Sequence, residues 1–299
     1  FPDGSEAIDS YLRLVREVND NLRAYYLSRA MRSSLGVITE RLFARKARRF
    51  QTATVAEVVS GLTNDPRLRM MFAAQWGDYG ATPSRASFSI QALVSKHFLW
   101  GGYYPVGGGG RIALELLRTV AEAGGWTRVC ADARELIIEG GRAVGVKLAN
   151  GEEVRAPTII SAMGASSTIT KLLPESMQRA KWAEEVVKLQ PGPAHVCLYM
   201  GFKGNIRAAG AGANSEWFYD TWNIEKATWN VSPDAAFGDM PAFYVSFSSL
   251  KNPIHEPGPD QKHTGVAVTF VPWDAFVPWR DKRWMRRGDD YTAFKDRLK

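Results

Sequence analysis

The residues with the clearest chemical potential are glycines that precede a helical stretch. Gly108, Gly110 and Ala113 match the relaxed Gly-x-Gly-x-x-Ala fingerprint of dinucleotide sites, in which backbone N–H groups at a helix N-terminus bind a pyrophosphate. Asp132 follows at roughly the distance where such sites place a ribose-binding carboxylate. However, residues 103–106 do not form the buried apolar strand that should lead into the turn. The favoured interpretation is a glycine turn that caps a helix, and an independent nucleotide site is the alternative.

Histidine and cysteine, which catalyse reactions or bind metals in many proteins, occur singly here. Cys130 and Cys197 lie in apolar, strand-like stretches, which predicts buried free thiols and favours a reducing compartment. The histidines show no ligand spacing with these cysteines, so we expect no metal site; they are His97, His195, His255 and His263. His97 is the one titratable candidate for catalysis, and a core histidine with satisfied hydrogen bonds is the alternative.

Composition places the chain among globular proteins. It has 299 residues, of which 45% are hydrophobic and 23% charged, enough to bury a substantial core. The longest apolar runs, such as residues 194–202, are too short to span a bilayer. Because the sequence begins with Phe1 instead of Met, we expect an internal piece of a longer protein, and the free thiols suggest a cytoplasmic one.

The net charge of +7 is concentrated in two basic clusters. The first contains Arg41, Arg45, Lys46, Arg48 and Arg49, and the second contains Arg280, Lys282, Arg283, Arg286 and Arg287. Aromatic residues surround the second cluster: Trp273, Phe276, Trp279 and Trp284. This mixture is typical of membrane interfaces and of single-stranded nucleic-acid sites, and no nucleic-acid motif accompanies it. We therefore predict no nucleic-acid partner and a peripheral membrane contact through residues 270–288. The alternative is that the tryptophans pack inward and the charges are merely solvated.

The elements that must position these residues fall into three regions. Helical periodicity dominates the first hundred residues, with expected helices over 5–31, 54–61, 65–76 and 84–99. Thr54 with Glu57 forms a capping box, and Asp65 with Pro66 marks a second helix start. The glycine turn then leads into a helix over 111–123 and three strands over 129–138, 143–148 and 153–161.

Beyond this region the sequence alternates helical and strand-like stretches. A helix is expected over 177–189, strands over 195–202, 242–247 and 265–271, and a final helix from 289. Asn150 and Gly151 predict a tight hairpin between the second and third strands of the preceding region.

The order of these elements, with several short motifs, resembles FAD-dependent phytoene desaturases, carotenoid isomerases and retinol saturases of the amine oxidase superfamily. The retinol saturase likeness rests on Gly77-Asp78-Tyr79-Gly80, Ser87-Phe88, His97 and the run from Gly101 to Gly108. The likeness to desaturases and isomerases rests on the run from Gly140 to Val146, on Asn150-Gly151-Glu152 and on the run from Ala156 to Met163. Later motifs, such as Tyr244-Val245-Ser246-Phe247 and Phe270-Val271-Pro272, agree with it.

The resemblance implies an α/β fold, in which an α+β substrate domain joins part of a FAD-binding flavoprotein domain. Residues 1–100 and 175–299 would form the substrate domain, and residues 101–174 would form a strip of the FAD domain. The residues implied to lie near FAD are Pro105, Gly107, Gly108, Ala133, Ser161, Ala162 and Met163. The family's main phosphate-binding and final flavin motifs are expected outside this sequence, so the chain by itself is not expected to retain FAD or activity.

The function implied is redox chemistry or isomerisation at carbon–carbon bonds of a hydrophobic isoprenoid, in a pocket whose walls include residues 217–229 and 243–247. Apolar surface at residues 103–106 and 159–162 is expected to be exposed, which would favour self-association. Two alternatives stay open. One is a non-catalytic membrane- or partner-binding module. The other is a flavin oxidase of the same fold with a non-isoprenoid substrate, such as an amine.

Overall fold

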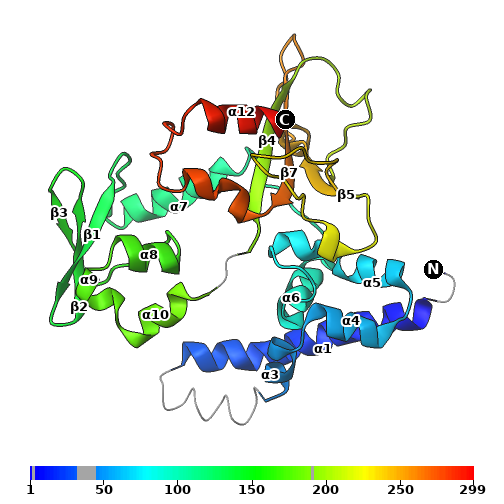
Figure 1. Ribbon diagram of the computed structural model, residues 1–299, viewed down its shortest axis with the longest axis horizontal. Helices are drawn as coiled ribbons and strands as arrows, with labels where there is room; N and C mark the ends of the chain where they lie inside the picture. Colours follow the sequence, from blue (N-terminus) through cyan, green and yellow to red (C-terminus); the bar gives the residue numbers. More distant parts are fainter. Residues whose placement is uncertain (2–3, 32–44, 190–191) are drawn as a thin grey trace. The chain divides into compact units, whose positions relative to one another are not determined.

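The computed structural model describes residues 1, 4–31, 45–189 and 192–299, with the side chains of residues 45 and 46 left aside. The chain forms two compact units, one made of Phe1–Arg111 with Gly192–Lys299 and the other of Ile112–Pro191. Helices and two antiparallel sheets build a mixed α/β protein, as predicted (Figure 1). No helix in the described part of the chain is long and apolar enough to cross a membrane. Of the first basic cluster, Arg41 lies outside the described residues.

The helical part of the first unit follows the predicted pattern closely. Its elements are α1 (Ser5–Ala30), α3 (Arg45–Thr52), α4 (Val55–Leu62), α5 (Pro66–Ala73), the 3-10 helix η1 (Ala74–Asp78) and α6 (Phe88–Phe98). The capping box at Thr54 is confirmed: its side chain accepts from the Glu57 backbone N–H, and the Glu57 carboxylate accepts from the Thr54 N–H. Asp65 caps α5 with Pro66 at the first helical position, also as predicted.

A buried polar network connects these helices. Gln91 of α6 is fully buried, and its amide donates to the Tyr11 hydroxyl of α1 and to the Phe72 carbonyl of α5. Its amide oxygen accepts a 2.6 Å hydrogen bond from the Tyr79 hydroxyl, just beyond η1. The Tyr11 ring also stacks on Phe72 at 4.4 Å. Every polar atom of the Gln91 side chain therefore has a partner, which a buried amide requires.

The sheet of the first unit has the strand order β4-β7-β6-β5, from Ala194–Phe202, His263–Val271, Ala242–Ser246 and Ser215–Tyr219. Three of its strands were predicted. Strand β5 lies in a stretch that was predicted to be an irregular connection. It pairs with β6 alone, at the edge of the sheet. Short segments η2 (Ile224–Lys226) and α11 (Ser248–Lys251) flank the strands.

One face of this sheet packs on the helices through aromatic side chains. Trp76 of η1 is fully buried against Phe270 of β7, with ring centroids 4.3 Å apart, and Trp217 of β5 stacks on the same Phe270. A Cβ at Gly77 would lie 2.1 Å from the Trp217 ring, so only glycine permits this approach. The glycine at this position is therefore a packing requirement.

A second, smaller core joins the sheet to the end of the chain. It contains Val231, Val271, Ala275, Trp279 and Phe294, the last three from η3 (Trp273–Trp279) and α12 (Asp289–Arg297). Trp279 is only 4% exposed and stacks on Phe294, and Phe276 packs against the same cluster. The prediction that Trp279 and Phe276 form part of a membrane contact is therefore wrong, because they complete this core.

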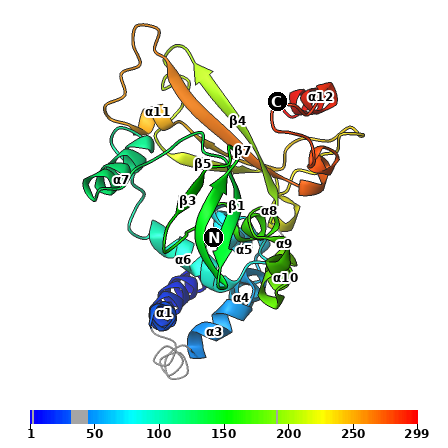
Figure 2. The same cartoon turned by 90° about the vertical axis from the view of Figure 1, so that its left-hand side faces the viewer.

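The second unit carries the three-stranded meander, whose strands are β1 (Ala133–Glu139), β2 (Arg142–Leu148) and β3 (Glu153–Arg155). Figure 2 shows these strands as one small sheet with α8 (Ala165–Lys171), α9 (Glu175–Gln178) and α10 (Lys181–Val187) beside it. Gly151 has a φ of +87°, as the predicted Asn-Gly hairpin requires. Helix α7 (Gly110–Glu122) precedes the meander, and none of its side chains is buried.

Two elements of this unit differ from prediction. The Ala156 N–H still donates to the Val144 carbonyl of β2 at 3.0 Å, but residues 157–161 pair with no strand of the described chain and form no strand themselves. The helix expected over 177–189 is split, since Ala180 takes an extended conformation between α9 and α10. The two cysteines are free, as predicted, but both are exposed, because Cys130 lies in a bend and Cys197 on an uncovered part of β4.

Candidate functional site

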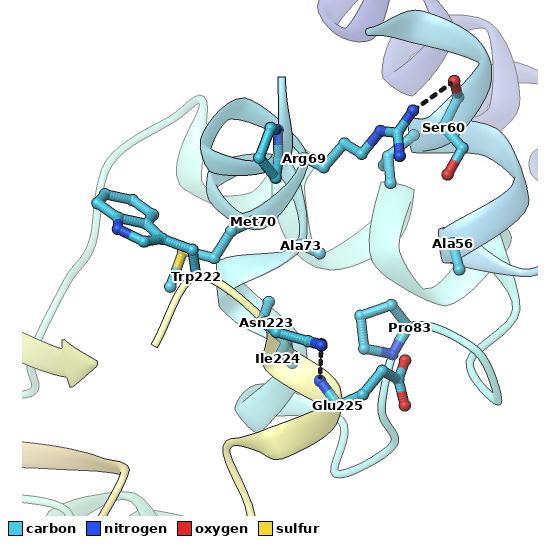
Figure 3. Close-up of a pocket in the computed structure, with 12 residues that line it drawn as sticks. Ala56, Ser60, Arg69, Met70, Ala73, Pro83, Trp222, Asn223, Ile224 and Glu225 are labelled. Atoms are coloured by element: carbon cyan, nitrogen blue, oxygen red, sulfur yellow. Dashed lines mark hydrogen bonds between the residues drawn. The ribbon is translucent and has the colours of Figure 1, made fainter. Parts of the chain in front are cut away.

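An apolar cavity of about 260 Å³ lies in the first unit, between helices α4 and α5 and the segment that contains η2 (Figure 3). Carbon atoms of Val59, Met70, Ala73 and Ile224 supply much of its wall. Trp222 closes one side, and its indole is 58% exposed. The remaining lining residues are Ala56, Ser60, Pro66, Arg69, Pro83, Asn223 and Glu225.

The charged groups at the edge of this cavity are occupied by the protein itself. Arg69 donates to the Thr63 carbonyl at 2.6 Å and to the Ser60 carbonyl at 3.5 Å (Figure 3). The Glu225 carboxylate accepts from the Ser84 backbone N–H and hydroxyl at 2.8 and 2.9 Å. Because the protein itself takes up hydrogen bonds of both side chains and the rest of the wall is mainly apolar, the cavity suits an apolar ligand better than a charged one.

A second cavity of about 370 Å³ shares two lining residues with the first. Met70 and Trp222 line both, so their side chains form the partition between them. Trp217 and Tyr219 of β5 belong to the second cavity. Residues of the predicted wall over 217–229 therefore do line these cavities, whereas residues 243–247 line neither of the two. The Tyr244 ring centre lies 5.2 Å from that of Trp217, which does line the second cavity.

Three titratable groups near the Trp217 ring were not singled out from the sequence: Asp78, Tyr79 and Tyr219. Burial raises the pKa of both Tyr79 and Tyr219, so these hydroxyls stay protonated and act as fixed hydrogen-bond donors. Tyr219 donates to the Ala74 carbonyl at 2.7 Å. Desolvation by neighbouring protein atoms also raises the pKa of Asp78, although its side chain keeps contact with solvent. The Gly77–Gly80 motif could have pointed to Asp78 and Tyr79, but it was interpreted only as part of the family resemblance.

His97 stands apart from this group. It lies exposed in the last turn of α6, so the interpretation as a core histidine is wrong. Its catalytic role stays a prediction. Among the described residues, no group of three or more His, Cys, Asp or Glu side chains gathers in a way that could hold a metal ion.

Comparison with known proteins gives relatives along the whole chain. No family model matches. An all-trans-retinol 13,14-reductase of Danio rerio is 28% identical over 311 residues, which cover 99% of this chain and 51% of the relative. A prolycopene isomerase of Daucus carota is 34% identical over 44% of this chain and 22% of its own length, and a phytoene desaturase of Cereibacter sphaeroides is 33% identical over 47% of this chain and 27% of its own length. The chain therefore resembles the retinol reductases over its whole length, and the prolycopene isomerases and phytoene desaturases over slightly less than half of it.

The chain spans about half the length of the retinol reductase that it matches. The likeness inferred from short motifs is thus confirmed, and it includes the three kinds of protein that the motifs indicated.

The glycine turn that the family likeness places near FAD has an unusual backbone. Gly107 and Gly108 have φ values of +89° and +85°, which disfavour any other residue. The Gly107 N–H donates to Asn252 Oδ1 at 3.0 Å, and the Gly108 N–H donates to the Pro105 carbonyl at 3.0 Å. A Cβ at Gly108 would meet only the Tyr104 hydroxyl, at 3.9 Å. The turn is therefore open beside Gly108.

The other residues implied to lie near FAD belong to the second unit. Ala133 begins β1 opposite Leu148, and Ser161, Ala162 and Met163 are exposed in the segment before α8. The Ser161 hydroxyl is 2.7 Å from that of Thr168. The residues implied to lie near FAD thus fall into two groups: Pro105, Gly107 and Gly108 in the first unit, and Ala133 with residues 161–163 in the second. Their role in binding FAD stays a prediction.

Exposed apolar surface lies where it was expected. Tyr103 and Val106 are 91% and 57% exposed, and Ile160 is 88% exposed. Self-association through this surface stays a prediction.

Proposed function

We propose that this chain belongs to a FAD-dependent oxidoreductase that acts on carbon–carbon bonds of a hydrophobic isoprenoid, of the retinoid or carotenoid class. The observation that carries the proposal is the similarity to a retinol reductase over 99% of the chain. Two neighbouring cavities with mainly apolar walls support it, since a polyene offers few groups for hydrogen bonding.

A bound flavin would supply the redox chemistry at the carbon–carbon bond, its oxidised form accepting a hydride and its reduced form donating one. Gly107 and Gly108 suit a close approach of the flavin to the backbone, since neither carries a side chain and the space around Gly108 is open. Pro105, Ala133 and Ser161 to Met163 would add contacts along the cofactor. These residues would bind and orient the cofactor.

The role of the chain's own side chains is to hold the substrate and keep water away. Met70 and Trp222 form the partition between the two cavities, and a flexible thioether beside a half-exposed indole can adjust to an elongated apolar ligand. Trp217 and Tyr219 provide flat surfaces against which conjugated double bonds pack well.

The test uses the complete gene product, purified with FAD and incubated under reducing and oxidising conditions with all-trans-retinol, a carotenoid and an aromatic amine. Chromatography with mass detection should show a gain or loss of two hydrogens, or a double-bond isomer, in the isoprenoid. Trp222→Ala should lower kcat/KM for the isoprenoid about tenfold, whereas Trp182→Ala, an exposed tryptophan of the second unit, should leave it unchanged. Turnover of the amine alone would refute the substrate class, and a protein that binds no flavin would refute the proposal as a whole.

A further inference from the structure

The connection between η3 and α12 ends in a turn with two apolar side chains at its tip. The Arg286 N–H donates to the Arg283 carbonyl at 2.9 Å, which makes Trp284 and Met285 the central residues of a β-turn. Their side chains are 77% and 80% exposed. Two large apolar side chains that are adjacent and almost completely solvated form a feature that folding alone does not explain.

The backbone of this turn is also strained. Met285 has a φ of +62°, in the left-handed region that glycine normally occupies at the third position of such a turn. A methionine there reduces stability, and its exposed side chain regains almost nothing through burial. Strain without compensating packing is typical of residues that serve binding.

Cationic side chains surround the tip. Residues 280–288 contain five of them and a single carboxylate, that of Asp281. Arg280 makes a long contact of 3.7 Å with Asp281. Lys282, Arg283 and Arg286 are exposed, and no ion pair of theirs is found within the described chain. The turn itself therefore carries a net positive charge around an apolar centre, with Asp289 and Asp296 lining the hollow beside Trp284 and Met285.

The base of the turn is held firmly on both sides. Before it, Trp279 is buried and its indole N–H donates to Asp290 at 2.8 Å. After it, the Arg287 guanidinium lies 4.8 Å from the Tyr291 ring centre and donates to the Tyr291 hydroxyl. The turn is thus anchored to the smaller core of the first unit, so binding through its tip does not require a long loop to become ordered.

We propose that residues 280–288 dock the protein on an anionic lipid surface, with Trp284 and Met285 inserted among the headgroups and Lys282, Arg283 and Arg286 on lipid phosphates. Tryptophan favours the headgroup level, because its ring is apolar and its N–H can remain hydrated. Basic side chains at the same level are attracted by the negative potential of the leaflet. The contact is narrower than the whole segment expected from sequence, because Trp279 is buried in the core and Trp273, which is 46% exposed, lies outside the turn.

The test measures sedimentation of the full chain with phosphatidylcholine vesicles that contain or lack phosphatidylserine, at low and at physiological salt. One variant combines Trp284→Ser with Met285→Gly; glycine relieves the positive φ, so this variant should fold at least as well. A second variant combines Arg283→Gln with Arg286→Gln. The matched controls are Trp126→Ser, an exposed tryptophan of the second unit, and Arg16→Gln with Arg23→Gln on α1.

The unaltered chain should bind the anionic vesicles, and more weakly at higher salt. The tip variant should lose at least tenfold in affinity, and the charge variant about 25-fold, at roughly fivefold for each of its two cations. Both controls should stay within about twofold of the unaltered chain. Brominated lipids should quench tryptophan fluorescence, and Trp284→Phe should remove most of that quenching. The proposal is overturned if the unaltered chain ignores anionic vesicles, if it binds neutral ones equally well, or if the tip variant binds as tightly as the unaltered chain.

Discussion

At the scale of single residues, Asp78 is a carboxyl with a raised pKa that lies near Tyr79 and Tyr219. It follows Gly77, whose missing side chain admits Trp217, and it lies at the end of η1. Its carboxyl lies near Tyr79 and Tyr219, whose hydroxyls have raised pKa values and remain neutral. The protein atoms around Asp78 displace water without offering a compensating cation, so its ionised form is disfavoured.

Asp78→Asn should therefore stabilise the protein at neutral pH and have a smaller effect as the pH falls. The pKa of Asp78 in the folded protein is raised above its ordinary value of 3.8. Its contribution to the free energy of unfolding is therefore fully present below pH 3.8 and is lost as the pH rises through the folded-state pKa. The gain is limited by solvent screening. Urea unfolding at several pH values between 4.5 and 7.5 measures it.

Asp65→Asn is the control of opposite sign. Hydrogen bonds from Arg67 lower the pKa of Asp65, so its carboxylate stabilises the fold at neutral pH and does so less as pH falls through the folded-state pKa. Asparagine keeps the capping side chain at this helix start. Destabilisation by Asp78→Asn at pH 7 would contradict the environment assigned to Asp78.

At the scale of elements, the helical half of the first unit depends on a polar contact as well as on apolar packing. Gln91 connects α6 to α1, to α5 and to the residue that follows η1, through three hydrogen bonds of its side chain. These elements support the cavity, because α5 supplies both Met70 and Ala73 to its wall. A change at Gln91 should consequently reach the site without touching any ligand.

Gln91→Leu should lower the free energy of unfolding by about 3 kcal/mol, because the Tyr79 hydroxyl loses its acceptor and the amide's own hydrogen bonds within the buried network are lost. Gln51→Leu on α3, where the side chain is only partly buried, is the matched control and should cost less than about 0.5 kcal/mol. Urea denaturation followed by circular dichroism measures both. A loss below about 1 kcal/mol for Gln91→Leu would show that the network contributes little.

At the scale of the whole molecule, the chain has two units with separate cores. The first unit contains two apolar clusters, built around Phe88 and Trp279. The second unit buries a smaller set of apolar side chains, namely Leu136, Leu148, Ile169, Leu172 and Ala183. A backbone hydrogen bond of 2.8 Å between Leu136 and Leu172 connects the meander to the helices of that unit.

The two units should therefore unfold in separate steps, and the second should unfold at the lower urea concentration because it buries less apolar surface. Hydrogen exchange with mass spectrometry over a urea series measures this peptide by peptide. Leu172→Ala should shift the second unit alone by about 2–5 kcal/mol, and Val15→Ala should shift the first unit alone. A single transition shared by all peptides would contradict the division.

Local signals in the sequence were sufficient for those features that neighbouring residues decide. The caps at Thr54 and Asp65, the hairpin at Gly151 and the helical periodicity of α1 depend on contacts within a few residues, and the structure has them all. The likeness to carotenoid and retinoid enzymes was likewise readable, because it rests on the order of short motifs along the chain.

Only the tertiary structure decided which side chains are buried and which side chains from distant segments contact one another. Burial depends on segments that arrive from far along the chain, so His97 and Cys197 turned out exposed, and Trp279 turned out to be core. The apolar cavity joins α4 and α5 to the segment around Ile224, more than 150 residues later. No local pattern encodes such a meeting, because the free energy that brings these segments together comes from the shared core and not from either segment alone.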